Sequence, residues 1–442
     1  MTRWLYALLM WLAQPLLLRK LRRRGAKEPG YLEYIDERFG RYAMAKPQQG
    51  GGPLVWIHAV SLGETRAAAV LITALRSEIP GMRLLLTHGT ATGRAEGRGL
   101  LQSGDLQCWQ PWDTIGAVSR FLQHFKPALG VLMETEIWPN LVHGCRQRGV
   151  PLVLANARLS DKSLRQAQRL AWLARPAYRA LTSVWAQTQA DADRLIQIGA
   201  PVRGVLGNLK FDATPDAQQM ATGRDWRAAL ARPVVILAVS REGEELSLLQ
   251  NLKAFVPPAV IHPSGNASIN VASRVHWLIV PRHPQRFDAV ADLIRAQGFG
   301  LSRRSQWGEV GPGGVAATGS PNVWLGDTLG EMALYYGLAD VALLGGSFEP
   351  LGGQNLIEAA ACGCPIVMGP HTFNFADAAE QALVAGAAQR VESLALGIQT
   401  AVALAVDAEN LMSSRLACGH FAQEHRGAAR RLAKVIASSE AV

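Results

Sequence analysis

Two short acidic segments have the residue types that acid–base chemistry needs. Glu64 lies in HAVSLGE (58–64), after an apolar run and at the start of a helical pattern. A carboxylate there can act as a general base or simply complement the helix dipole. Glu134 and Glu136 follow the apolar run 128–133 in METEIWPN. Alternation along a continuing strand would send these two side chains to opposite sides, so we expect one to face a ligand cleft and one to anchor the turn.

Two basic residues occupy comparable positions further along the chain. Lys210 lies in GNLKFD (207–212), and Arg282 lies in PRHPQR directly after the apolar run 277–280. The planar guanidinium fork of arginine binds the oxygens of a phosphate or carboxylate in pairs. We therefore expect both residues to reach into a ligand site, with a surface charge as the alternative for either.

A glycine-lined loop offers the strongest sign of a bound ligand. The apolar run 341–344 is typical of a buried strand and stops at Gly345-Gly346-Ser347, and a second glycine pair, Gly352-Gly353, precedes a helical pattern over 356–362. Free backbone N–H groups and the helix dipole at such a junction favour an anion. The loop predicts binding of a phosphate-bearing small molecule, and Ser347, Gly352 and Gly353 are candidate contacts.

A purely structural role for the same loop is the alternative. Asn355 and Glu358 have the N-cap and N3 spacing of a capping box, which many helices use only to satisfy their first amides. The doubled glycines on both sides of Ser347 favour anion binding over this alternative.

Several other kinds of site are not expected from this sequence. It contains no Walker P-loop and no Gly-x-Ser-x-Gly elbow. Asp191 and Asp193 form an Asp-x-Asp pair, but they lie in a helical pattern that points them in different directions, so we predict no metal there. The five cysteines have no metal-type spacing, which indicates a reducing compartment without disulfides or zinc: Cys108, Cys145, Cys362, Cys364 and Cys418.

The N-terminus combines an apolar run with a basic one. Residues 5–18 are apolar apart from Gln14 and Pro15, and residues 19–24 read RKLRRR. Fourteen residues are too few for a spanning helix, which needs about twenty. Basic residues after rather than before the apolar run argue against a cleaved signal peptide and for a cytoplasmic body. With a net charge of +10, we expect a membrane-anchored or peripheral protein on an anionic membrane surface. The alternative is a buried helix with a solvated basic end.

Alternating strand and helix patterns predict an α/β protein with mainly parallel sheets. A polar stretch over 212–225 divides the alternation into two doubly wound halves, with a ligand cleft expected between them. Residues 257–273 fit neither pattern and are expected to form an inserted loop. Strands are expected over 53–59, 82–87, 128–133, 150–155, 183–187, 234–238, 277–280, 341–344 and 365–368, and helices over 31–42, 65–77, 115–125, 142–148, 164–180, 356–362 and 402–435.

Together these segments resemble one known family, the 3-deoxy-D-manno-octulosonic acid (Kdo) transferases of lipopolysaccharide synthesis. Their order and spacing match over most of the chain: the apolar-then-basic N-terminus, HAVSLGE, METEIWPN, ANARLS (155–160), GNLKFD, EGEE (242–245), VPRHPQRF, GDTLGEM (326–332), GGSFEPLGGQNLIEAA and GPHTFNF. The resemblance implies the two-domain GT-B glycosyltransferase fold. It divides the chain into a membrane-anchor segment (1–24), an acceptor-binding domain (25–211) and a donor-binding domain (212–442).

The resemblance also implies an activity: inverting transfer of Kdo from CMP-Kdo to the lipid A precursor, lipid IVA, at the cytoplasmic face of the inner membrane. No metal, cofactor, nucleic acid or obligate protein partner is implied. Glu64 matches the general base of the family, and Glu134 and Lys210 match positions that stabilise the transition state. The CMP-binding segments match Pro281, Arg282, Leu329, Gly330, Glu331, Asn355, Leu356, Ile357 and Glu358.

Three features depart from the family pattern. Gln354 and Arg241 stand where histidine is common, and both positions bear on donor contacts. The segment 257–273 is longer than usual. Two other functions remain open: a UDP-sugar transferase of the same fold with a different membrane-bound acceptor, and a membrane-associated protein that binds nucleotides or nucleic acid without catalysis.

Overall fold

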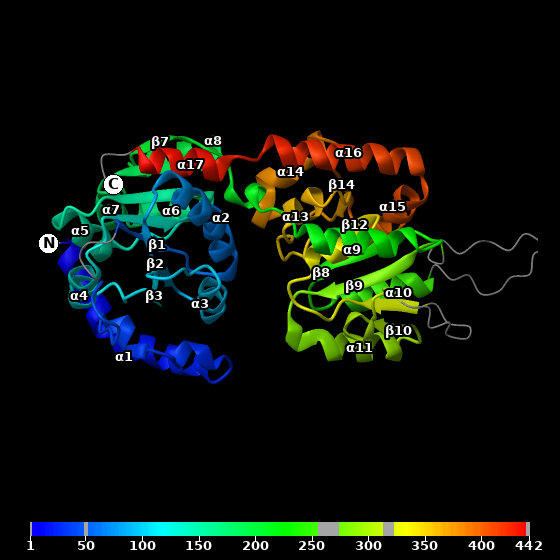
Figure 1. Ribbon diagram of the computed structural model, residues 1–442, viewed down its shortest axis with the longest axis horizontal. Helices are drawn as coiled ribbons and strands as arrows, with labels where there is room; N and C mark the ends of the chain where they lie inside the picture. The colour runs from blue at the N-terminus through cyan, green and yellow to red at the C-terminus, as the bar shows by residue number, and fades with distance from the viewer. Residues whose placement is uncertain (1, 48–51, 255–273, 313–321, 439–442) are drawn as a thin grey trace, which may run out of the picture. The chain divides into compact units, whose positions relative to one another are not determined.

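A computed structural model describes residues 2–47, 52–254, 274–312 and 322–438 (Figure 1). The chain forms two compact units. The first unit comprises Met1–Ala213 and His425–Val442, and the second comprises Thr214–Glu424. The predicted inserted loop at 257–273 lies outside the described residues. The predicted cleft between the halves stays a prediction, and each unit is described by itself.

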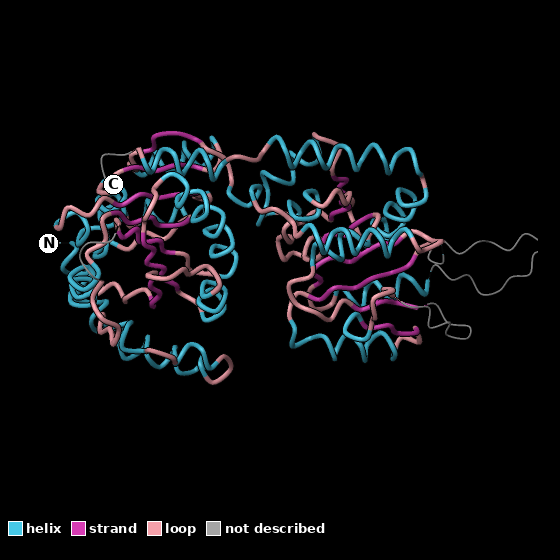
Figure 2. The backbone as a smooth tube through the Cα atoms, in the orientation of Figure 1, coloured by secondary structure: helices cyan, strands magenta, loops and turns pink. Residues whose placement is uncertain are grey.

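The first unit is built on a seven-stranded parallel sheet with the order β3-β2-β1-β4-β5-β6-β7. Figure 2 shows the strands in magenta and the helices in cyan. Its strands are β1 (Leu54–His58), β2 (Arg83–His88), β3 (Leu106–Trp109), β4 (Leu129–Met133), β5 (Leu152–Ala157), β6 (Ser183–Ala186) and β7 (Val202–Val205). Its helices are α1 (Thr2–Gly25), α2 (Leu62–Glu78), α3 (Ala91–Arg98), α4 (Ile115–Phe125), α5 (Pro139–Gln147), α6 (Asp161–Arg169), α7 (Ala171–Arg179), α8 (Gln189–Ile198) and α17 (Ala428–Ala437), with short 3₁₀ helices η1 (Pro29–Leu32), η2 (Ile35–Phe39) and η3 (Leu209–Asp212).

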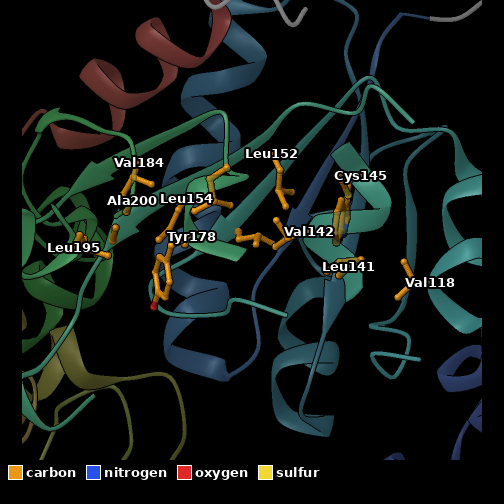
Figure 3. Close-up of a cluster of buried hydrophobic side chains, with 14 of the residues drawn as sticks. Val118, Leu141, Val142, Cys145, Leu152, Leu154, Tyr178, Val184, Leu195 and Ala200 are labelled. Atoms are coloured by element: carbon orange, nitrogen blue, oxygen red, sulfur yellow. The ribbon is translucent and has the colours of Figure 1, made fainter. Parts of the chain in front are cut away.

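Both faces of this sheet are covered, which explains the continuous apolar strands in the sequence. Alternate residues of β1 point to opposite faces. Trp56 belongs to a core cluster with α4, α5 and α8, part of which Figure 3 shows, whereas Val55 and Ile57 belong to a second cluster with α2 and α17. The strand order reverses between β1 and β4, so the loops after these two strands open at the carboxyl ends of adjacent strands.

The second unit repeats this plan with the order β10-β11-β9-β8-β12-β13-β14, all parallel. Its order reverses between β8 and β12. Its strands are β8 (Val234–Ser240), β9 (His276–Pro281), β10 (Gly300–Arg303), β11 (Asn322–Leu325), β12 (Val341–Leu344), β13 (Ile366–Met368) and β14 (Ala388–Arg390). Its helices are α9 (Ala217–Ala228), α10 (Glu244–Ala254), α11 (Phe287–Ala296), α12 (Met332–Leu338), α13 (Leu356–Ala361), α14 (Ala376–Val384), α15 (Leu394–Val406) and α16 (Ala408–Glu424).

The structure corrects the predicted boundary at the C-terminus. The sequence division assigned residues 212–442 to one domain, but the chain returns to the first unit at His425. Helix α17 packs there because its apolar face, which includes Leu432 and Ile436, completes the core cluster that contains α2. The polar stretch over 212–225 is also not a connection throughout, because most of it forms helix α9 of the second unit.

Smaller differences have local causes. The expected helix over 31–42 consists of short 3₁₀ turns around Tyr34, which has a left-handed backbone. The expected helix over 164–180 divides at Leu170 into α6 and α7. Strand β3 and helix α3 were not predicted; α3 contains two glycines, which weaken the helical pattern.

Helix α1 carries the N-terminal apolar and basic runs. Its large apolar side chains are mostly solvent-exposed, and its last turn holds Arg22, Arg23 and Arg24. The alternative of a buried helix is therefore wrong for this face, and the predicted membrane association stays a prediction. In the described parts of the chain, no single helix is both long and apolar enough to cross a membrane, while the bent pair Leu394–Val406 and Ala408–Ala437 meets that test by length and composition only.

Candidate active site

In the first unit, Glu64 lies in the first turn of α2, after the carboxyl end of β1. Ser61 caps the helix, and its hydroxyl donates to Glu64 Oε1 at 3.0 Å, while Val60 N–H donates to Oε2 at 3.0 Å. Burial raises the pKa of the Glu64 carboxyl to about 7, against the Val60 hydrogen bond, which lowers it, and the nearby Glu134 and Glu136 raise it further. Glu64 remains partly exposed. It therefore closes a capping arrangement and is also poised to exchange a proton near neutral pH.

Glu134 occupies the equivalent position after β4, the neighbouring strand. Its backbone is left-handed, with φ 57°, a conformation that is uncommon for residues other than glycine. Its N–H donates to Ala155 O at 3.0 Å, which fixes the turn against β5. The Lys210 ammonium lies 3.4 Å from Glu134 Oε1, longer than a typical charge-assisted hydrogen bond. The structure thus brings Glu64, Glu134 and Lys210 together at one edge of the sheet, and their predicted roles stay predictions.

Glu136 is the second glutamate of the same turn and is partly buried. Burial raises the pKa of its carboxyl, and the nearby Glu134 raises it further. Of the two glutamates, Glu134 is the one that faces Lys210. Glu136 contributes to the negative field around Glu64.

Asn156 supports this cluster, and the sequence analysis did not select it as a site residue. It also has a left-handed backbone, with φ 52°, and is 1% exposed. Its Oδ1 accepts from Leu209 N–H at 3.0 Å and so holds η3, the short helix that carries Lys210. The motif ANARLS contains this residue, but its contact spans 53 positions of the chain and has no local signal.

In the second unit, the glycine-lined loop after β12 is occupied by the protein's own carboxylate. Gly346 N–H lies 2.8 Å from both oxygens of Glu244, and Arg241 N–H donates to Oε2 at 2.8 Å. Glu244 is 1% exposed, and burial raises the pKa of its carboxyl. The loop was expected to offer free amides to an anion, but the amide of Gly346 is already hydrogen-bonded to Glu244.

Ser347 is likewise a structural residue. It is fully buried, its hydroxyl bonds to Leu344 O, and Gly369 N–H donates to its Oγ at 2.9 Å. Gly352 and Gly353 both have left-handed backbones, with φ 88° and 73°. A Cβ on Gly352 would lie 2.4 Å from the Asn374 side chain, so the second pair is required by the turn itself.

Positive charge gathers beside this loop, at the carboxyl ends of β8 and β9. Arg282 follows Pro281, and its backbone N–H donates to Ser240 O at 3.1 Å. Among the described residues its guanidinium has no ion pair, and burial together with Arg241 lowers its pKa. Arg286, four residues on, instead forms a two-point ion pair of 2.8 and 3.0 Å with Glu245, which is fully buried. Arg282 is thus available for an anionic ligand, while Arg286 is committed to the fold.

The predicted segment 329–331 joins a polar network that the sequence did not reveal. Arg304 donates to Glu331 at 2.9 Å and lies over the rings of Trp226 and Trp307. Gly330, with φ 79°, accepts from Gln219 through its carbonyl, and Leu329 is 69% exposed. Glu331 is held by these partners at the surface of the second unit.

The start of α13 matches its prediction in part. Asn355 Oδ1 accepts from Ile357 N–H at 3.2 Å, so this residue is the N-cap. Leu356 and Ile357 are buried, which leaves Asn355 and Glu358 as the side chains near the surface. Gln354, just before the cap, is 7% exposed, and its Nε2 has no hydrogen-bond partner in the described structure.

The Asp191-x-Asp193 pair takes its expected place in helix α8. Asp191 accepts from Leu159 N–H and the Thr188 hydroxyl and pairs with Arg194. Within the described ranges, no three His, Cys, Asp or Glu side chains gather as metal ligands.

Comparison with known proteins decides the family. The family model for 3-deoxy-D-manno-octulosonic-acid transferases matches residues 33–213. The chain is 43% identical over 438 residues to the 3-deoxy-D-manno-octulosonic acid transferase of Bordetella pertussis, covering 98% of each chain. The chain belongs to the Kdo transferase family. The resemblance drawn from the motifs is confirmed, and the protein is a glycosyltransferase of this family.

Solved structures establish the fold of this Kdo transferase family member independently. A UDP-GlcNAc 2-epimerase from Neisseria meningitidis has a TM-score of 0.53 at 14% identity, covering 84% of this chain and 98% of its own. The kitacinnamycin glycosyltransferase has a TM-score of 0.52 at 14% identity, covering 87% and 98%. At such identities the likeness shows the fold alone, and it confirms two Rossmann-like α/β units of the kind found in GT-B glycosyltransferases.

Proposed function

We propose that this protein transfers Kdo from CMP-Kdo to a lipid A precursor, lipid IVA, in lipopolysaccharide biosynthesis. The observation that carries this proposal is the cluster of Glu64, Glu134 and Lys210 at the strand ends of the first unit, in a chain 43% identical to a Kdo transferase. The first unit supplies the general base, and the second unit binds the donor.

Glu64 removes the proton from the acceptor hydroxyl. A base works best when its pKa lies near the working pH, and the pKa of Glu64 is raised to about 7. Its partial exposure lets a sugar hydroxyl reach the carboxylate. The oxygen attacks the anomeric carbon of Kdo as the bond to the CMP phosphate breaks, and this direct displacement inverts the anomeric configuration.

Charge develops on both partners of the breaking bond. The sugar becomes oxocarbenium-like, and the Glu134 carboxylate favours that positive charge. The departing phosphate gains negative charge, which a cation such as the ammonium of Lys210 stabilises. In the second unit, the guanidinium of Arg282 is a candidate for binding the phosphate of the donor. Pro281, Glu331 and the segment 355–358 are the remaining donor-binding candidates. Since these cations supply the charge that a metal would otherwise supply, we propose that transfer needs no metal or cofactor.

Helix α1 holds the enzyme on the cytoplasmic side of the inner membrane. Its exposed apolar side chains include Trp4, Leu8 and Trp11, each more than half exposed. A groove at its C-terminal end is strongly basic, and each such charge near an anionic surface contributes roughly 1 kcal/mol. The groove is lined by Leu16, Arg19, Lys20, Arg23, Arg24 and Lys27. The same charges suit the phosphates of the acceptor.

The test is transfer of radiolabelled Kdo from CMP-Kdo to detergent-dispersed lipid IVA, with and without EDTA. Wild-type protein should label the acceptor, and mass spectrometry should count the Kdo groups added. Glu64→Gln should lower kcat by about 10²- to 10⁴-fold, the usual contribution of general base catalysis, while CMP still binds. Full activity in Glu64→Gln would limit this residue to helix capping.

The competing hypothesis keeps the fold but has a UDP-sugar as the donor. If folded wild-type protein transfers no Kdo and is inhibited by UDP rather than CMP, the UDP-sugar alternative replaces the proposal. Nucleotide or nucleic-acid binding without any sugar transfer would make the protein a binding protein instead.

A further inference from the structure

The short helix η3, which carries Lys210, is held in place by contacts with two distant parts of the chain. Asn156 holds Leu209 N–H, as described above. On its other side, Leu209 is fully buried among residues of α17, and Phe211 stacks on His425 with ring centroids 4.7 Å apart. The C-terminal segment therefore forms part of the support under Lys210.

Asp212 makes the polar link in this support. Its two carboxylate oxygens accept separately from the N–H of Gly427, the N-cap residue of α17, and from the N–H of Ala429 in the first turn. Gly427 has a left-handed backbone, with φ 91°, which turns both amides toward Asp212. A carboxylate at a helix N-terminus is stabilised both by these amides and by the helix dipole.

Helix α17 in turn packs on α2, the helix that begins with the Glu64 turn (Figure 1). Leu432, Ala433 and Ile436 share one core cluster with Ala68, Leu71 and Leu75 of α2. One helix therefore lies behind both predicted catalytic groups of the first unit: it packs against α2 directly, and it holds η3 through Asp212.

We infer that Asp212 is a positioning residue that keeps the Lys210 ammonium beside Glu134 by fastening η3 to the first turn of α17. This inference rests on the proposed function of Lys210. Asp212 lies two residues from Lys210 on a single short helix, so loss of its bonds releases that end of η3. A displacement of about 1 Å at a catalytic group can cost about a hundredfold in rate.

The simpler explanation is that Asp212 only caps a helix, and the chain offers a matched control for that role. Asp216 is also an aspartate N-cap, and its Oδ1 accepts from Gln219 N–H at 2.8 Å at the start of α9. It belongs to the second unit, and its cap hydrogen bond joins no residue of η3 or α17. Asp216→Asn therefore measures the loss of an aspartate cap alone.

The first measurement compares kcat of Asp212→Asn with that of Asp216→Asn in the wild-type and Lys210→Ala backgrounds. We expect Asp212→Asn to lower kcat tenfold to a hundredfold with the KM for CMP-Kdo unchanged. In the Lys210→Ala background it should cost less than about twofold more, because the group that it positions is gone. Asp216→Asn should leave kcat unchanged in both backgrounds. An equal loss from Asp212→Asn in both backgrounds would overturn the inference.

A second measurement does not depend on any transfer activity. Acetylation of Lys210 by an amine-reactive ester, followed by mass spectrometry of its peptide, reports how firmly the ammonium is held. Asp212→Asn should speed this labelling several-fold and Asp216→Asn should not, at a temperature where both variants are folded by circular dichroism. Equal labelling rates would reject the positioning role even if Kdo transfer is confirmed. Faster labelling in a protein without Kdo transfer would support it while the proposed function fails.

Discussion

The two units place glutamates in contrasting environments at the same point of the same fold. Where the strand order reverses in the first unit, the loops after β1 and β4 carry Glu64 and Glu134. At the corresponding point of the second unit, the loops after β8 and β12 carry Glu244 and Gly346, joined by hydrogen bonds. Glu64 is partly exposed, whereas Glu244 is 1% exposed. Position in the fold therefore does not fix the role of a carboxylate; its partners and its exposure do.

The same contrast applies to the basic residues. In the second unit the buried carboxylates of Glu244 and Glu245 are satisfied by backbone amides and by Arg286, so Arg241 and Arg282 remain to meet an anion. In the first unit Lys210 pairs with Glu134, whose charge in turn raises the pKa of Glu64. These charges agree with the proposal that the second unit binds an anionic donor and that the first supplies the general base.

The largest expected effect distinguishes the structural role of Arg286 from the ligand-binding role proposed for Arg282. Arg286→Ala leaves Glu245 buried without its partner, and we expect a loss of about 3–5 kcal/mol in the free energy of unfolding. Arg282→Ala should leave stability within about 0.5 kcal/mol of wild type. It should weaken CMP binding by about ten- to a hundredfold, the value of a charge-assisted hydrogen bond. Urea denaturation and calorimetric titration with CMP measure both, and the division of roles fails if the two variants behave alike.

Ser347→Ala sharpens the comparison by testing a residue that the sequence placed among the ligand contacts. Removing the hydroxyl leaves Gly369 N–H buried without an acceptor. We expect unfolding to become easier by about 1–3 kcal/mol, with CMP affinity unchanged in the folded protein. Weaker CMP binding at unchanged stability would restore the ligand-binding interpretation.

The smallest expected effect concerns the pH dependence of transfer. A general base must be ionised, so kcat should rise with pH through the pKa of Glu64, about 7. The charge of Glu134 raises this pKa, so Glu134→Gln should move the rising limb to lower pH, by up to about one pH unit. Normalised profiles of kcat between about pH 5 and pH 9 would show the shift, because this range extends roughly two pH units on either side of a pKa of about 7. A limb that stays in place or moves upward would remove Glu134 from the electrostatic environment of Glu64.

Sequence reasoning succeeded where the signal is local. The buried parallel strands, the acidic residues at their carboxyl ends and Arg282 after β9 are visible as short patterns, and the structure has them in those places. The roles of these residues stay predictions. Glu64 illustrates how far local pattern goes. Its place at the start of a helix fits a general base or a carboxylate that complements the helix dipole. The structure adds the hydrogen bond with Ser61 and a pKa raised to about 7.

The contacts that the sequence could not reveal join residues far apart in the chain. Glu244 reaches Gly346 across 102 positions, and Asp212 reaches Gly427 across 215. No periodicity or propensity encodes such pairs, since each half of the pair is an ordinary residue in its own segment. For the same reason α17 was assigned to the wrong unit: its amphipathic pattern predicts a helix but not the surface that it covers.

The return of α17 to the first unit also sets the order in which the protein can be completed during synthesis. The first unit comes off the ribosome first, but the helix that fills its core behind α2 follows only after residues 214–424 have been made. At about 5–20 residues per second this interval lasts roughly 10–40 s. During that time the strands of the first sheet already pack against α2, but the part of its surface that α17 covers has no permanent cover. The nascent first unit is therefore a natural client for chaperones until the last segment arrives.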